Sequence, residues 1–200
     1  MTSQSIQQLI EAFQLLPGVG PKTAERYAFY LVRTGNDEIT EILDALNKVR
    51  ASIVQCAQCF NFAEISPCEI CSSPKRDKTI VCVVSHSADV VALEKTGSFN
   101  GVYHILGGTL NAIEGVRPEH LKIKELTARA RQGVAKELII ALNADMEGET
   151  TSLYLVKLLQ PLGIRLTRLA RGLPMGSDIQ YADELTLANA LNDRKNLGGE

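Results

Sequence analysis

Two CxxC pairs constrain this chain more than any other feature of its sequence. Cys56 and Cys59 form the first pair, Cys68 and Cys71 form the second, and eight residues separate the pairs. This is the spacing of paired zinc knuckles, in which four thiolates close a tetrahedron around one ion. Two disulfides are the alternative, but intracellular thiols are kept reduced. We expect one structural Zn²⁺ per chain, because four thiolates leave no open coordination position for catalysis.

The remaining composition points to an intracellular chain without a basic character. The first eight residues lack the regions of a signal peptide, and no stretch approaches the roughly 18 apolar residues of a membrane helix. A cytoplasmic location with no membrane partner is therefore expected. The fifth cysteine, Cys82, lies in an apolar run and is expected to be buried rather than a ligand. A formal net charge of -2 means that any contact with DNA must come from a local patch.

Helical periodicity dominates residues 1–54. Apolar spacing predicts helices over residues 6–15, 22–33 and 38–54. The sharp break at residues 16–21, which read Leu-Pro-Gly-Val-Gly-Pro, predicts a tight hairpin between the first two helices. The amino-terminal part is therefore expected to be a helix-hairpin-helix followed by a third helix.

The hairpin carries residues suited to phosphate contact. Gly18 and Gly20 allow a compact turn, and Pro21 begins the next helix where no amide donor is needed. Free amides at such a helix start hold phosphate oxygens, and Lys22 and Arg26, four residues apart, share one helix face. The pattern predicts DNA binding without sequence specificity through these glycines and cations. The alternative is an ordinary corner between two helices, since neighbouring glutamates dilute the patch.

After the cysteines, strands and helices alternate, which predicts an α/β fold with a mainly parallel sheet. The expected strands are residues 79–84, 102–106, 137–142 and 165–170, and the expected helices are 88–95, 122–131, 150–159 and 183–191. The stretch 107–120 is expected to be a long loop of the kind that serves binding or assembly.

An acidic loop, Asn-Ala-Asp-Met-Glu-Gly-Glu, follows the third expected strand, where ligands bind in α/β sheets. It resembles the DxDxEGE loop of Toprim domains, which holds magnesium together with a glutamate after the first strand. Here Asn143 replaces the first aspartate, and Ser85 and His86 follow the first strand. Losing two carboxylates removes much of the oxygen set that magnesium prefers. Compensation of a helix dipole is the alternative role for Glu147 and Glu149.

The three histidines are not expected to be catalytic. His86 adjoins Ser85, but neighbours at a strand end point to opposite sides, so the two form a poor base and nucleophile pair. His104 has apolar strand neighbours and is expected in a core or an interface. His120 is expected on a surface loop.

Several motifs occur in a specific order along nearly the whole chain. They are GPKTAER in the hairpin, the four cysteines, YHILGG at 103–108, the acidic loop, ARGLPMGSD at 170–178 and YADE at 181–184. This order resembles the RecR family of bacterial recombination mediators. The chain departs from the family at Ser85 and His86, where an acidic residue is common. It departs again where Ala144 and Asp145 replace a proline and an uncharged residue.

The resemblance implies a four-part organisation. The expected parts are a helix-hairpin-helix domain over 1–54, a four-cysteine zinc finger over 55–75, a Toprim-like domain over 76–170 and a C-terminal assembly segment over 171–200. It further implies a ring-forming homo-oligomer, a tetramer, that acts with RecO and RecF to place RecA on gapped DNA. Weak phosphate contacts of single chains become effective when several hairpins share one closed assembly.

The acidic residues Asp145, Glu147 and Glu149 are expected to face a basic partner such as RecO, where charge complementarity speeds encounter. The expected function is therefore binding and assembly rather than catalysis. A magnesium-dependent Toprim enzyme, such as a nuclease or a primase fragment, is the alternative. The incomplete acidic set favours the mediator, because metal-assisted phosphoryl chemistry needs a defined number of ligands.

Overall fold

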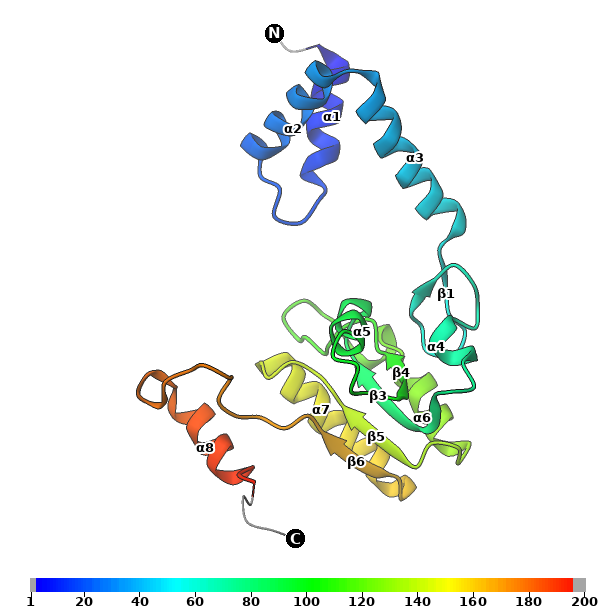
Figure 1. Ribbon diagram of the computed structural model, residues 1–200, viewed down its shortest axis with the longest axis vertical. Helices are drawn as coiled ribbons and strands as arrows, with labels where there is room; N and C mark the ends of the chain where they lie inside the picture. Colours follow the sequence, from blue (N-terminus) through cyan, green and yellow to red (C-terminus); the bar gives the residue numbers. More distant parts are fainter. Residues whose placement is uncertain (1–2, 196–200) are drawn as a thin grey trace. The chain divides into compact units, whose positions relative to one another are not determined.

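The computed structural model describes residues 3–195, and the chain divides into two compact units between Ile53 and Val54 (Figure 1). The last five residues of the expected segment 171–200, and the first two of the segment 1–54, lie outside the described residues. None of the helices within 3–195 has the length and apolar character needed to cross a bilayer.

The first unit contains the three expected helices: α1 (Gln4–Gln14), α2 (Pro21–Thr34) and α3 (Asn36–Ser52). Ser3 caps α1 by accepting a hydrogen bond from the Ile6 amide at 3.4 Å. Gly35, with φ of 111°, forms the short joint between α2 and α3. The third helix ends two residues earlier than expected, because Val54 is paired in a strand.

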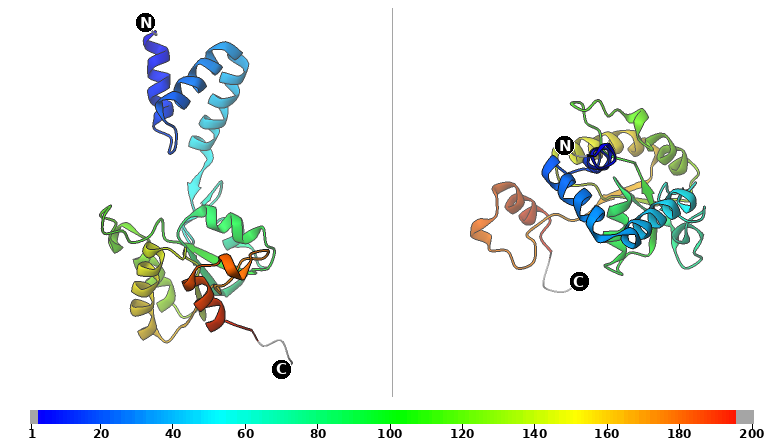
Figure 2. Two further views of the ribbon diagram at one scale, coloured as in Figure 1. Left: turned by 90° about the vertical axis from the view of Figure 1, so that its left-hand side faces the viewer. Right: turned by 90° about the horizontal axis from the view of Figure 1, so that it is seen from above.

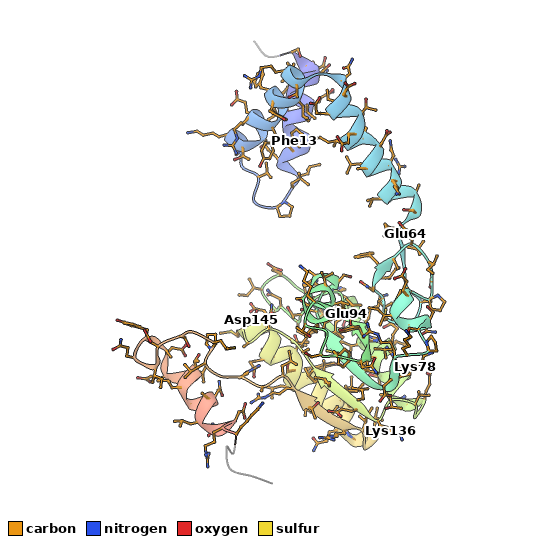
Figure 3. The ribbon with its side chains drawn as sticks, viewed as in Figure 1. Phe13, Glu64, Lys78, Glu94, Lys136 and Asp145 are labelled. Atoms are coloured by element: carbon orange, nitrogen blue, oxygen red, sulfur yellow. The ribbon has the colours of Figure 1, made fainter. Side chains whose placement is uncertain are left out.

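The core of the first unit lies between α1 and α2, which pack against each other in both views of Figure 2. Ala24 and Ala28 are fully buried on α2 and face Ile10 of α1. Their small side chains let the two backbones approach closely. Apolar side chains of α1 and the hairpin, Phe13 among them, pack around this contact (Figure 3). Apolar periodicity predicted these two helices, and their small and apolar side chains form this core.

The second unit opens with a small ribbon that the sequence did not reveal. Strands β1 (Val54–Gln55) and β2 (Phe62–Ala63) pair in antiparallel fashion, and the short helix α4 (Glu69–Ser72) follows. Two-residue strands carry too little alternation to be recognised from sequence. Together these elements form the zinc module, with its cysteines held on the turn of the ribbon and around α4.

The larger part of this unit is a four-stranded sheet, and all its pairings are parallel, as expected. Its strand order is β4-β3-β5-β6, from β3 (Asp77–Val84), β4 (Gly101–Ile105), β5 (Glu137–Ile140) and β6 (Arg165–Arg168). The helices of this unit that follow α4 are α5 (Ser87–Glu94), α6 (Ile123–Arg131), α7 (Met146–Leu159) and α8 (Glu184–Asn192). The α/β class and the alternation of strands and helices are thereby confirmed.

Two cores lie on opposite faces of the sheet, as the two-residue period of a strand requires. Val81 and Val83 of β3 belong to the core that includes Leu126 of α6. Cys82 and Val84 point the other way, into the core that contains the four paired cysteines. Cys82 is therefore a buried strand residue, as expected.

Two segments differ from their predictions. Helix α7 begins at Met146 rather than at residue 150, so most of the expected acidic loop is helical. The stretch 107–120 is not a plain loop, because Asn111 and Val116 form a β-bridge and residues Pro118–His120 form a 3₁₀ helix. Asp145 caps the start of α7 and Pro118 opens the 3₁₀ helix, and apolar periodicity registers neither residue.

Candidate functional site

The four paired cysteines come together as a candidate metal centre. All four are buried, none more than 3% exposed, and their Sγ atoms lie within 4.8 Å of one another. A tetrahedron with Zn–S bonds of about 2.3 Å has edges of about 3.8 Å, so this spread accommodates one zinc ion. The Sγ atoms of Cys59 and Cys68, one from each pair, are 3.5 Å apart. The geometry fits a closed structural zinc site, and Zn²⁺ is the cofactor of this module.

At Cys56, backbone amides favour the thiolate form that zinc requires. The Cys68 amide donates to the Sγ of Cys56 at 3.3 Å. Burial tends to raise the pKa of Cys56, but hydrogen bonds from the amides of Cys68, Cys59 and Gln58 outweigh it and lower this pKa to about 6. A thiolate therefore forms here more readily than in a free cysteine, which suits a metal ligand.

The zinc module is fastened to the edge of the sheet at β4. The Ile105 amide donates to the Cys59 carbonyl at 2.8 Å, so the module continues the hydrogen bonding of the edge strand. Phe60, at a positive φ of 67°, places its ring edge-on against His104 at 5.2 Å. The Lys122 ammonium lies over the Phe60 ring, 5.2 Å from its centroid, and forms a cation–π contact with it. Sequence reasoning missed Phe60, since only its place after a CxxC pair marks it.

Arg129 of α6 joins the same region. Its Nη1 donates to the Tyr103 carbonyl at 2.7 Å. Burial lowers the pKa of Arg129, and the thiolates of Cys71, Cys59 and Cys56 act in the opposite direction. The periodicity of α6 identifies Arg129 only as a polar helix residue, so sequence reasoning missed its position beside the cysteines.

The hairpin of the first unit leaves backbone donors free. Gly18 has φ of 78°, a region that favours glycine, and Gly20 is the N-cap of α2 with Pro21 at the first helical position. The Ala24 amide donates to the Gly20 carbonyl at 3.0 Å. The amides of Gly18, Gly20, Lys22 and Thr23 have no acceptor within residues 3–195. Such a group of free donors at a helix start can bind an anion.

Lys22 and Arg26 are both exposed on α2, and their spacing of four residues puts them on one face of this helix. The Arg26 guanidinium lies 5.6 Å from the ring centroid of Tyr27. Neither cation has a carboxylate partner among the described residues. Glu11, one of the acids near the hairpin, instead accepts a hydrogen bond from the Gln7 amide group at 3.1 Å. Both cations are therefore available to a phosphate backbone.

The acidic residues at the start of α7 have different surroundings. Asp145, labelled in Figure 3, is the N-cap and accepts a hydrogen bond from the Gly148 amide at 2.7 Å. Glu149 forms an ion pair with Arg171, which lowers the pKa of Glu149. Glu147 has no hydrogen-bond or ion-pair partner for its side chain within the described chain. Asp145 thus caps the helix and Glu149 pairs with Arg171, while the Glu147 side chain makes no such contact within the described chain.

The end of β3 is also used for capping. Ser85 is buried, and its hydroxyl donates to Asp89 Oδ2 at 2.8 Å. The His86 amide donates to the same oxygen at 2.8 Å, and the His86 side chain is exposed. The Ser85 hydroxyl thus serves this cap, and no hydrogen bond among the described residues joins it to the His86 side chain. Across residues 3–195, the four cysteines are the only grouping of three or more histidine, cysteine or acidic side chains placed to share an ion.

The other histidines have structural surroundings. His104 is fully buried, and its Nε2 lies 2.8 Å from the Lys122 carbonyl. Burial lowers the pKa of His104 to about 4, so the ring is neutral at ordinary pH. The core position of His104 is confirmed. His120 lies in the 3₁₀ helix rather than on a loop, and its Nδ1 accepts a hydrogen bond from the Arg117 amide at 3.2 Å.

Comparison with known proteins agrees with this geometry. Family models match four consecutive parts of the chain: the RecR helix-hairpin-helix at residues 6–50, the RecR four-cysteine zinc finger domain at 53–73, the Toprim domain at 79–170 and the RecR C-terminal model at 172–195. The zinc finger match contains the four clustered cysteines.

Curated relatives match over nearly the whole length. The recombination protein RecR of Moorella thermoacetica is 47% identical over 97% of this chain and 98% of its own. Those of Herpetosiphon aurantiacus and Thermobifida fusca are each 46% identical over 98% of this chain, covering 97% and 99% of their own lengths. The chain therefore belongs to the RecR family of recombination proteins.

Proposed function

We propose that this member of the family is a non-enzymatic mediator of recombinational DNA repair. It binds DNA through its helix-hairpin-helix and acts with RecO and RecF to promote loading of RecA on gapped single-stranded DNA. The observation that carries the proposal is the hairpin, where four free backbone amides adjoin two exposed cations, Lys22 and Arg26. Phosphate is the ligand that this donor set fits, and phosphate contacts carry no sequence information.

Binding of gapped DNA by Lys22→Ala and Arg26→Ala variants tests this proposal. Each substitution is expected to weaken binding about equally on unrelated sequences and to reduce the slope of log K against log salt by about one. Zinc content and helical signal are expected to stay unchanged, because both side chains are exposed.

Arg33→Ala is the matched control. Arg33 is an exposed cation on the same helix, eleven residues from Lys22 and therefore about 16 Å further along the axis. It is expected to leave the salt slope nearly unchanged. Parental affinity in both hairpin variants would make the hairpin a structural corner only.

The exposed face of α3 supports assembly into a ring. Ile42, Leu46, Val49 and Ile53 follow one another at helical spacing, and all are exposed in the single chain, Leu46 to 61%. No residue of α3 is buried. An uncovered apolar stripe of this kind needs a partner surface, and a second copy of the chain supplies one in a closed homo-oligomer such as a tetramer.

Solution mass measured by light scattering tests the assembly. The parent is expected to be a multiple of the chain mass at micromolar concentration, and Leu46→Glu is expected to lower that mass. Asn47→Glu introduces the same charge at a neighbouring exposed position off the stripe and is expected to leave the assembly intact. A parent that is strictly monomeric would reject the ring.

The start of α7 is proposed as the docking site for RecO, with Glu147 as its free carboxylate and Asp145 and Glu149 adding to the negative field. Glu147→Lys is expected to impair RecO binding while sparing DNA binding and zinc. Glu64→Lys makes the same charge change on the zinc module, away from Asp145 in Figure 3, and serves as the control. Full RecO affinity in a pull-down with Glu147→Lys would reject this docking site.

A further inference from the structure

A zinc ion held by four thiolates is a centre of two net negative charges, because the ligands carry four negative charges and the ion two positive ones. Here the centre is withdrawn from water, since the four cysteines are at most 3% exposed. The amides of Cys68, Cys59 and Gln58 donate to Cys56, the first at 3.3 Å, and offset part of this charge. A buried charge of this kind requires a nearby cation or it weakens the site.

Arg129 is the cation that the fold places against this centre. It lines a cavity of about 420 Å³ together with Cys71 and with Gln58 of the zinc module. Burial lowers the pKa of its guanidinium, and the thiolates of Cys71, Cys59 and Cys56 oppose that lowering. The side chain is also fixed in direction, because its Nη1 donates to the Tyr103 carbonyl at 2.7 Å.

The other cations nearby are less well placed. Lys78 lines the same cavity but is exposed to water, which screens its charge. Lys122 lies over the Phe60 ring and pairs with Glu125 at 3.6 Å, so its ammonium already has partners. Arg129 is the cation of this group that is partly buried, lines the cavity beside Cys71 and is held in place by a hydrogen bond.

We propose that Arg129 is a positioning residue for the zinc centre: its charge neutralises part of the tetrathiolate and its hydrogen bond ties that centre to the sheet. Tyr103 and Ile105 are two residues apart on β4 and so turn their backbone groups to the same edge. Arg129 satisfies the Tyr103 carbonyl, and the Cys59 carbonyl satisfies the Ile105 amide. Arg129 and the zinc module thus both form hydrogen bonds with the outer edge of β4.

Zinc affinity in competition with a chromophoric chelator tests the proposal. Arg129→Gln is expected to weaken zinc binding about ten-fold or more, the range found when partners of metal ligands are removed. Arg129→Lys keeps the charge and is expected to hold zinc within about three-fold of the parent, close to the limit of context effects on such contacts. Circular dichroism with excess zinc checks that each variant is folded.

Arg131→Gln is the matched control, since Arg131 is an exposed arginine on the same helix and its loss changes the net charge equally. It is expected to bind zinc like the parent. Parental affinity in Arg129→Gln would overturn the proposal. Equal weakening in Arg129→Gln and Arg129→Lys would overturn the charge role of Arg129, because lysine keeps the positive charge.

If Arg129→Gln does not fold even with excess zinc, the zinc affinity of a Gln132→Glu variant tests the proposal instead. Gln132 is exposed and lines the same cavity as Arg129 and Cys71, so this change adds a negative charge there and keeps the hydrogen bond to Tyr103. It is expected to weaken zinc binding several-fold, because the added carboxylate repels the negative zinc–thiolate centre. Unchanged affinity would count against the role of charge.

Discussion

Replacing Asp145 by alanine and by asparagine separates its two roles at the start of α7. Asp145 accepts the Gly148 amide at 2.7 Å, and Gly148 is buried, so alanine leaves a buried donor without an acceptor. Loss of an N-cap costs about 1 kcal/mol, and an unpaired buried amide costs about 1–3 kcal/mol. Both costs refer to the same hydrogen bond and are therefore not added. Asp145→Ala is expected to lose about 1–2 kcal/mol of unfolding free energy.

Asparagine keeps an acceptor at the same place and is an equally good N-cap. It removes only the charge at the helix start, which at this exposed position is worth about 0.3–0.5 kcal/mol. Urea unfolding of zinc-saturated protein, followed by circular dichroism, measures both variants. The asparagine variant is expected to lie between the parent and the alanine variant, and nearer to the parent.

Equal loss of stability in the two variants would refute the capping argument, because the charge alone would then account for the effect. The same pair addresses docking. Both substitutions remove one negative charge, so RecO binding that depends on charge falls equally in both variants. If RecO binding falls only in the alanine variant, docking depends on the capped structure of the helix start rather than on its charge.

The remaining predictions concern zinc, the hairpin and pH. Serine at any one of Cys56, Cys59, Cys68 or Cys71 is expected to unfold the zinc module, and elemental analysis well below one zinc per parent chain would contradict the site. Gly18→Ala is expected to lower the thermal midpoint through a backbone cost of about 1 kcal/mol, since φ is 78° and a Cβ would meet no atom within 4 Å. Gly20→Ala, at φ of -79°, is expected to lose less, and equal losses would refute this reasoning. For His104 the folded pKa of about 4 lies below its usual 6.5, so the unfolded chain binds the extra proton and stability falls as pH drops from 6.5 towards 4. His104→Asn is expected to flatten that part of the curve of urea midpoint against pH, and an unchanged slope would contradict it.

The sequence predicted those features that repeat along an element. The helix faces of the hairpin and the alternation of Val81, Cys82 and Val83 between two cores follow from periods of 3.6 and 2 residues. The zinc site was predictable for a different reason, because CxxC spacing by itself limits where the thiolates can meet. Ribbon strands of two residues offered neither signal.

Contacts between distant segments could not be predicted. Arg129 reaches the Tyr103 carbonyl across 26 positions of the chain, and Arg171 pairs with Glu149 across 22. Both arginines occupy positions whose local sequence only marks them as polar. Their partners are determined by how α6 and the segment after β6 lie against the sheet, which a single sequence does not specify.

The likeness of the acidic loop to a metal-binding Toprim loop has a physical explanation without metal. A Cβ at Gly148 would overlap the Asn143 carbonyl, so the close approach of helix and loop requires glycine there. Asp145 is required as the cap of the same turn, and Glu149 as the partner of Arg171. At the end of β3, Ser85 and Asp89 form the corresponding cap. The residues at both strand ends thus hold the helices in place. The contact with phosphate that we propose lies instead at the hairpin, where the amides of Gly18, Gly20, Lys22 and Thr23 have no acceptor within residues 3–195.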